Sequence, residues 1–241
     1  MIKTIIKKAL NKTNTAIEKQ FSSKARFGRK NKDISIISNN CIAGFLCRDL
    51  GIPYNSPTVG LQFTQAGFVD FCRNFSYYIQ LPITYHPDLP ENDFRALGGE
   101  NIDFPVGKLG DLVLFLQRYK TVEEAATAWE RRRERLNSSK LFFIFMAYDN
   151  TETSIISDFE SLPLNNSLTL SLNRNYSTLG VPLLCGKAPW FSVDSSSGKP
   201  YYWKFDYINW FRECLEKQSS EQGAAPAAIP LRSIAAGELG R

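Results

Sequence analysis

Apolar residues recur along the chain with two periods, one typical of strands and one typical of helices. Short apolar runs bounded by polar or turn-forming residues predict strands over 33–40, 59–63, 82–86, 140–150 and 168–173, and a hairpin or bent strand over 105–119. Apolar residues spaced by three or four predict helices over 2–21, 41–50, 64–80, 121–136 and 153–162, with a last strand and helix within 200–217. Strands that alternate with helices indicate an α/β fold, with a layered mixed sheet flanked by helices and an N-terminal basic amphipathic helix.

The segments between these elements predict the domain organisation. Residues 22–32 have the composition of a linker, and 87–105 that of a loop rich in proline and glycine. From residue 219 onward the chain has too little apolar bulk to pack, which is typical of disorder. We therefore expect a basic amphipathic arm and linker over 1–32, a single α/β domain over 33–218 and a disordered tail over 219–241.

The helix predicted over 121–136 carries an anomaly on its apolar side. Its apolar stripe passes through positions 132 and 133, and both are arginines. At least one guanidinium, Arg132 or Arg133, should therefore face the protein. A buried guanidinium needs a carboxylate, carbonyl groups or a bound anion. An internal partner such as Asp149 or Asp111 is one interpretation, and a phosphate, pyrophosphate or acidic sugar in a pocket is the other.

Positive charge is concentrated at the N-terminus. The chain has a net charge of +5, yet residues 1–32 hold ten Lys or Arg and one acid and so carry +9. In 2–21 the lysines lie opposite an apolar helical face, and such a helix can lie on an anionic membrane surface. A helix that packs on its own domain, or a frayed terminus, remains the alternative. No nucleic-acid partner is expected, because the charge lies in one arm without a recognised binding module.

Other features limit the class of protein. No apolar run reaches the roughly 18–20 residues of a membrane span, and no signal-peptide pattern opens the chain, so we expect a cytoplasmic protein, with a peripheral position on the inner face of the membrane left open. The odd cysteine count and the single histidine predict neither a disulfide framework nor a metal site. No P-loop, G-x-G-x-x-G after a strand or G-x-S-x-G is present, and no cofactor is expected.

Two predicted strands end abruptly in polar residues. One end is Ser38-Asn39-Asn40-Cys41, and the other is Tyr148-Asp149-Asn150. Ligands of α/β sheets bind outside the carboxyl ends of the strands, and neighbouring strands would bring these two ends together. We therefore expect a ligand site there, with Ser38, Asn39 and Asn40 as polar binders and Asp149 as a general acid or base.

Cys41 stands where a helix begins, and a helix start lowers the pKa of a thiol. The functional interpretation is a nucleophile, with Asn39 or Asn40 helping to bind an oxyanion. The structural one is a small buried residue preceded by ordinary helix-capping side chains. His86 is the one possible imidazole base. It precedes a proline at a predicted strand end. There it could act as a general base for Cys41 or a serine, or it could be an ordinary surface residue.

Three blocks of sequence together resemble the bacterial family catalogued as domain of unknown function nineteen-nineteen. The block S-N-N-C falls on 38–41, P-Y-N-S-P on 53–57, and Trp-x-x-Arg-x-x-Arg on Trp129, Arg132 and Arg135. The similarity runs from about Ile34 to Trp210. The ligand-binding candidates within these blocks are Ser38, Asn39, Asn40, Asn55, Arg132 and Arg135.

The resemblance implies a role in exopolysaccharide or capsule biosynthesis. The leading hypothesis is a cytoplasmic enzyme that modifies a glycan or its lipid- or nucleotide-linked precursor by acyl or glycosyl transfer. Its catalytic candidates are Cys41, Asp149 and His86, and its partners would be a glycan and an activated sugar or acyl donor. The alternative is a non-catalytic binding or scaffold protein of a membrane-associated glycan assembly complex.

Overall fold

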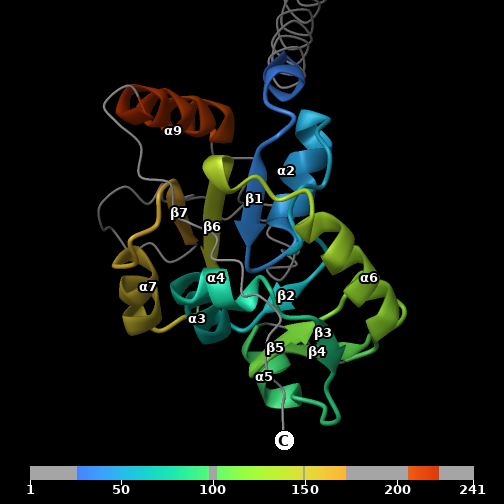
Figure 1. The fold of residues 1–241 in the computed structure, drawn as a ribbon. Coiled ribbons are helices and arrows are strands. Elements are labelled where there is room, and N and C mark those ends of the chain that lie inside the picture. The colour runs from blue at the N-terminus through green and yellow to red at the C-terminus, as the bar shows by residue number, and fades with distance from the viewer. Residues whose placement is uncertain (1–25, 98–101, 149, 172–205, 223–241) are drawn as a thin grey trace, which may run out of the picture.

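Two sheets organise the computed structural model, which describes residues 26–97, 102–148, 150–171 and 206–222. The first sheet is parallel and has the strand order β1-β6-β7 (Figure 1). Its strands are β1 (Ser35–Ser38), β6 (Leu141–Ala147) and β7 (Ser167–Ser171). The α/β class is therefore confirmed, with parallel and antiparallel strands in separate sheets.

Central strand β6 is buried on both faces, as its continuous apolar sequence predicts. Successive side chains of a strand point to opposite faces. Accordingly, Phe142, Ile144 and Met146 pack with α2 (Ile42–Leu50) and α9 (Tyr207–Gln222). The alternate residues of β6 pack on the other face with α3 (Gln65–Arg73) and α7 (Thr153–Glu160). The parallel sheet therefore lies between two apolar cores.

The second sheet is antiparallel, with the strand order β2-β5-β4-β3. Its strands are β2 (Gln62–Phe63), β3 (Ile83–Tyr85), β4 (Val106–Leu109) and β5 (Leu112–Phe115). The hairpin predicted over 105–119 is confirmed, because β4 and β5 pair across a turn where Gly110 has φ +65°. Strand β2 is shorter than predicted, since Gly60 turns the chain with φ +85° just before it.

Local sequence explains where the main helices begin and end. Helix α2 ends at Gly51, which takes the left-handed conformation that favours glycine. Helix α6 (Val122–Arg133) begins at the predicted capping box, where Thr121 accepts from the amide of Glu124. The helix expected over 64–80 is interrupted at Asn74 and continues as α4 (Phe75–Tyr78).

Three predictions about irregular segments need correction. Part of the predicted linker, residues 26–30, is helical, and its Phe27 is buried against Phe211 of α9. The loop predicted over 87–105 contains the short helix α5 (Glu91–Ala96). Helix α9 extends into the predicted tail as far as Gln222. The segments 1–25 and 223–241 lie outside the described residues.

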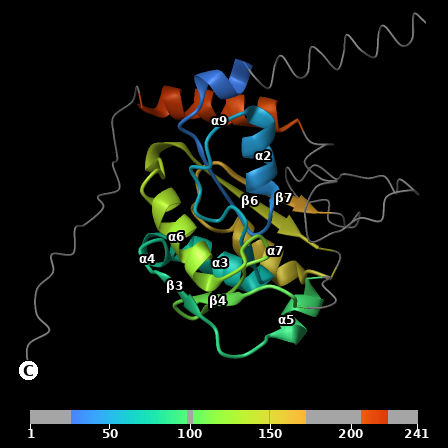
Figure 2. The ribbon, with the colours of Figure 1, turned by 90° about the vertical axis from the view of Figure 1, so that its right-hand side faces the viewer.

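Figures 1 and 2 show how these elements are distributed along the molecule. The 26–30 helix and α9 lie at one end, and α5 with β3 and β4 lies at the opposite end. Strand β1 runs between these ends, and α2 returns beside it. Among the described residues, no helix has the length and apolar character needed to span a membrane.

Candidate functional site

A cavity of about 400 Å³ opens beside α2, and three arginines line it. One wall is a single face of α2, with Cys41, Gly44, Phe45 and Arg48 at helical spacing. The other walls come from the loop before β2, the segment after β5 and helix α6. We call this cavity the arginine pocket; its full lining is Cys41, Gly44, Phe45, Arg48, Tyr54, Val59, Gly60, Arg118, Tyr119 and Arg132.

Close backbone approach brings these walls together. A Cβ added to Gly44 would lie 3.2 Å from Val59 Cγ1, so the loop rests directly on α2. A Cβ on Gly60 would lie 3.2 Å from the ring of Tyr119 and 3.3 Å from Arg118 Cβ. The small residues therefore let the loop lie between α2 and the segment after β5.

Two arginines of the family block hold the same loop: Arg132 in α6 and Arg135 just after its C-terminal end. Arg132 Nη1 donates to the carbonyl oxygen of Val59 and to the Tyr119 hydroxyl, both at 2.5 Å. The Arg132 guanidinium also lies over the Tyr54 ring, 5.5 Å from its centroid. Arg135 is exposed and donates to the Tyr54 carbonyl oxygen at 2.9 Å. The Trp-x-x-Arg-x-x-Arg and P-Y-N-S-P blocks are thus in direct contact.

The inward arginine predicted from the sequence is Arg132, whose exposed fraction is 8%. Its hydrogen-bond partners are neutral, and its buried Nε has no partner among the described residues. Asp111, one predicted partner, instead accepts from the Tyr78 hydroxyl at 2.8 Å. Asp149, the other, lies outside the described residues. Within the described chain, Arg132 is therefore a buried cation without a carboxylate.

Two further guanidiniums add positive charge to the pocket. Arg118 is exposed and pairs with no carboxylate in the part of the chain that the structure describes. Arg48 lies 3.7 Å from Asp49, with most of its side chain exposed, and such pairs are weak. None of the described residues that line the pocket is acidic. The arrangement is suited to an anionic ligand, because guanidiniums bind phosphate and carboxylate groups through paired donors.

The electrostatic effect of Arg132 reaches its neighbours. Burial raises the pKa of the Tyr119 hydroxyl, and the Arg132 charge partly opposes this. Burial likewise raises the pKa of the Cys47 thiol to about 12, against a smaller lowering by Arg132. Both groups are therefore neutral near pH 7. Cys47 points into the core rather than the pocket and is unsuited to act as a nucleophile.

The polar side chains at the end of β1 form hydrogen bonds within the protein. Ser38, Asn39 and Asn40 are fully buried. Asn39 Nδ2 donates to the Met146 carbonyl oxygen at 2.9 Å, and Asn39 Oδ1 accepts from the Met146 amide at the same distance. This pair of bonds fixes β1 to the central strand. Asn39 does not line the pocket, and its predicted ligand contact stays a prediction.

Ser38 and Asn40 accept hydrogen bonds from backbone amides at the start of α2. Asn40 Oδ1 accepts from the amide of Ile42 at 3.0 Å, and Ser38 Oγ accepts from Ala43 at 3.1 Å. The free backbone amides at the start of a helix can donate hydrogen bonds to an anion. Here two of those amides already donate to the side chains of Asn40 and Ser38. Neither residue lines the pocket. Charge recognition in the pocket therefore depends on its arginines.

Of the three catalytic candidates, Asp149 lies outside the described residues, and Cys41 and His86 lie on different elements. Cys41 lines the pocket at the start of α2. His86 follows β3, where its Nδ1 lies 2.8 Å from the Asp88 carbonyl oxygen, and it does not line the pocket.

Asn55 is buried and donates to the Lys32 carbonyl oxygen at 2.7 Å, so it holds the loop in place. The pocket thus includes Cys41 and Arg132 from the predicted set.

Arg48, Arg118, Tyr54 and Tyr119 are pocket residues that the sequence prediction did not include. Arg48 could have been found, because it lies two helical turns after Cys41 and so on the same face of α2. Arg118 lies inside the hairpin predicted over 105–119, so the strand-end signal that pointed to Ser38 did not mark it. The approach of Tyr54 to α6 is a long-range contact without a local signal.

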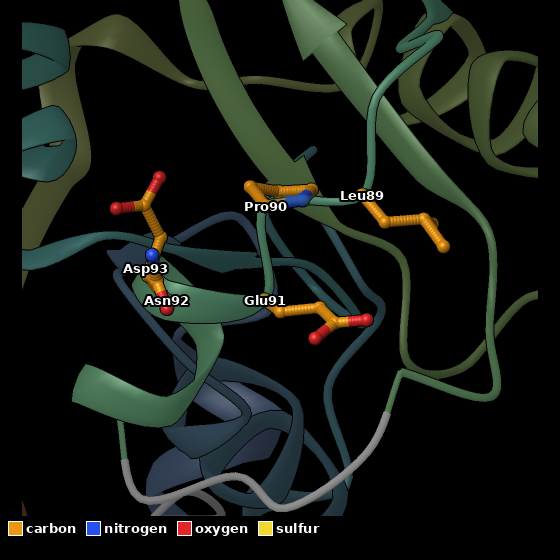
Figure 3. Close-up of a pocket in the computed structure, with 5 residues that line it drawn as sticks. All are labelled: Leu89, Pro90, Glu91, Asn92 and Asp93. Carbon is orange, nitrogen blue, oxygen red and sulfur yellow. The ribbon is translucent and has the colours of Figure 1, made fainter.

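A second hollow lies on the surface at the start of α5, and a single run of five consecutive residues lines it. Leu89, Pro90, Glu91, Asn92 and Asp93 line it. Figure 3 shows that the Glu91 and Asp93 carboxylates point away from each other. Across the described ranges, no group of three His, Cys, Asp or Glu side chains is placed to hold a metal ion. The arginine pocket is therefore the stronger candidate.

Fold and pocket together define an α/β protein with a cationic cavity beside the first strand of a parallel sheet. The chain belongs to the family described as Domain of unknown function (DUF1919), which matches residues 12–212. It is also 28% identical over 214 residues to an uncharacterized protein of Haemophilus influenzae, covering 86% of this chain and 96% of that protein. The family suggested by the three sequence blocks is thus confirmed.

Proposed function

We propose that the protein binds an anionic sugar, or the phosphate-bearing precursor of one, in the arginine pocket during assembly of surface polysaccharide. The observation that carries this proposal is the buried Arg132 guanidinium, which has no carboxylate partner among the described residues and lies in a cavity that Arg48 and Arg118 also line. A bound phosphate, pyrophosphate or uronic-acid carboxylate would supply the missing negative charge. The link to exopolysaccharide or capsule rests on the family resemblance.

Acyl or glycosyl transfer is the chemistry we propose for this pocket. Cys41 is the candidate nucleophile that lines it, and Tyr54, with an exposed fraction of 39%, offers an aromatic ring for a sugar to pack on. A non-catalytic binding or scaffold role is the second candidate. It is favoured by the position of His86 outside the pocket, which leaves Cys41 without that base.

A peripheral position on the inner face of the membrane is part of the proposal. Precursors of surface polysaccharides that are linked to lipid would be presented at that face. The cationic N-terminal segment supports such a position, since residues 1–32 carry +9.

The experiment replaces Arg118 with glutamine in the native host and compares surface glycan composition. Arg118→Gln removes one pocket charge at an exposed position and should leave the fold intact. The matched control is Arg131→Gln, an exposed arginine of α6 that does not line the pocket. We expect altered or reduced glycan for the first variant and unchanged glycan for the second. Unchanged glycan in both, with each protein folded and present at normal level, contradicts the proposal.

Cys41→Ser separates the two candidate roles. An acyltransferase that uses the thiol loses transfer but keeps binding of its anionic ligand. A binding or scaffold protein keeps its effect on glycan composition when the thiol becomes a hydroxyl. Binding and glycan composition are therefore measured on the same variant.

A further inference from the structure

Residues 26–32 form a cationic surface that is fixed to the folded domain. Arg26, Arg29, Lys30 and Lys32 are all exposed, and none forms an ion pair with a described carboxylate. We call these four side chains the basic face. Asp33, the next acid in the sequence, is paired with Lys140 at 2.8 Å. The positive charge of this face is therefore not neutralised by its own segment.

Packing of the intervening residues holds the basic face in position. Phe27 is buried in the core and stacks on Phe211 with ring centroids 5.7 Å apart. A Cβ on Gly28 would lie 1.8 Å from the Leu50 carbonyl oxygen, so this turn rests directly on the end of α2. Asn55 fixes the Lys32 backbone. Because positions 27 and 28 face inward, the cationic side chains between and around them must face outward.

The neighbouring surface does not offset this charge. Helix α9 lies beside the 26–30 helix (Figure 2), and its charged residues described as exposed, Arg212, Glu213, Glu216 and Lys217, sum to no net charge. On the other side, Arg48 lies two residues before Leu50 and lines the arginine pocket. In the sequence, residues 1–25 add six more lysines. The basic face and Arg48 therefore both lie at the C-terminal end of α2, where Asp49 is 3.7 Å from Arg48.

We infer that the basic face rests on an anionic lipid bilayer and places the Arg48 side of the arginine pocket beside the lipid headgroups. The inference rests on the peripheral location proposed above and names the folded surface responsible. Each Lys or Arg close to an anionic leaflet contributes about 1 kcal/mol. Nucleic acid is the less suitable partner, because the face is one short helical turn without a groove or an aromatic platform.

The experiment is cosedimentation of the full-length chain with vesicles of phosphatidylcholine containing about 30% phosphatidylserine. The variant carries glutamine at Arg26, Arg29 and Lys30. The pocket residue Arg48 is left unchanged. We expect the partition coefficient to fall roughly fivefold for each cation removed, and the binding of the wild-type chain to weaken as salt is added. Vesicles of phosphatidylcholine alone should bind neither protein.

A control variant removes three cations from the opposite end of the molecule, where α5 and β4 lie (Figure 1). Glutamine replaces the exposed residues Arg95, Lys108 and Lys120, so both variants have the same net charge. The control should bind vesicles like the wild-type chain. Equal loss in both variants, or none in the variant of the basic face, overturns the inference.

Two further measurements keep the outcomes distinct. Titration of the basic-face variant with inorganic pyrophosphate should give wild-type affinity, so failure of the pocket proposal would not be confused with failure of membrane docking. Titration with a duplex RNA at about 0.15 M salt should show no specific loss in the variant. Tight RNA binding that depends on the basic face, without vesicle binding, also overturns the inference.

Discussion

The Arg132 side chain of α6 donates to the backbone carbonyl oxygen of Val59 at 2.5 Å. This bond joins the last turns of a helix to the loop that precedes β2, 73 residues earlier in the chain. It positions the guanidinium at the wall of a cavity but leaves its charge without a counterion among the described residues. The same side chain is therefore both a structural support and the centre of the candidate site.

Replacing Arg132 with methionine should separate these two roles. The Tyr119 hydroxyl also donates to the Val59 carbonyl oxygen, at 2.9 Å, so neither group is left without a partner in Arg132→Met. Because Arg132 is buried without a counterion among the described residues, an apolar side chain in its place also removes a desolvation penalty. We therefore expect unchanged or higher stability in urea, together with loss of pyrophosphate binding in calorimetry.

Arg133→Met is the control for that variant, because Arg133 is partly exposed and donates to the Gln80 carbonyl oxygen instead. It should keep pyrophosphate affinity. A loss of stability in Arg132→Met well above that of the control would mean that Arg132 is neutralised by a group of the protein itself.

Asn39→Ala should lower stability without changing ligand affinity. The substitution leaves both the amide and the carbonyl group of Met146 without their side-chain partner, inside the central strand. Each unsatisfied buried group costs about 1–3 kcal/mol, so we expect the two groups to cost about 2–6 kcal/mol in chemical denaturation. Asn92→Ala, at an exposed position of α5, should change stability little. A folded Asn39→Ala protein that binds pyrophosphate more weakly than wild type would instead support the ligand contact predicted from the sequence.

Stability should fall as the pH rises above 9, in part because of Cys47. Burial raises the pKa of this thiol from 9.0 to about 12, so the folded state holds the proton more tightly than the unfolded chain. The contribution is intact below pH 9 and decreases as the pH approaches 12, by up to about 1.4 kcal/mol per pH unit. Urea unfolding at pH 8 to 11 tests this. Cys47→Ala should show a shallower decrease, and an unchanged slope would contradict the assignment.

Gly28→Ala should destabilise the attachment of the 26–30 helix. The added Cβ would overlap the backbone carbonyl of Leu50, and overpacking of this kind costs about 1–3 kcal/mol or more. Gly51→Ala is a suitable comparison, since φ +64° imposes about 1 kcal/mol of strain but a Cβ there meets no atom within 4 Å. We expect faster trypsin cleavage after Arg29 in Gly28→Ala only. Equal cleavage in the two variants would mean that this helix is not held by α2.

The elements with a strong local signal could be predicted from the sequence. The apolar run of β6, the capping box of α6 and the glycine end of α2 each depend on neighbouring residues, and each is confirmed. The division into two sheets could not be predicted, because strand pairing depends on contacts between distant residues. Helix 26–30 was interpreted as a linker, since only its contact with α9 shows why Phe27 is buried.

The inward-facing arginine could be predicted because a polar residue interrupted an apolar pattern. Arg132 broke the stripe of α6, and its burial is confirmed. The same signal was ambiguous for Asn39 and Asn40. A polar side chain at a strand end can form hydrogen bonds either with a ligand or with the backbone of the protein. Here the Asn39 side chain bonds to the backbone of a distant strand, which no local pattern indicates.

Thermal unfolding with inorganic pyrophosphate, at constant ionic strength, tests the anion pocket most directly. A ligand at a hundredfold excess over its Kd contributes about 2.7 kcal/mol, which corresponds to a rise in Tm of roughly 5–10 °C for a chain of this size. We predict a saturable rise of this order for wild type and Arg131→Gln, and a much smaller one for Arg48→Gln and Arg118→Gln. No rise in wild type, or the same rise in all four proteins, would contradict an anion site formed by these arginines.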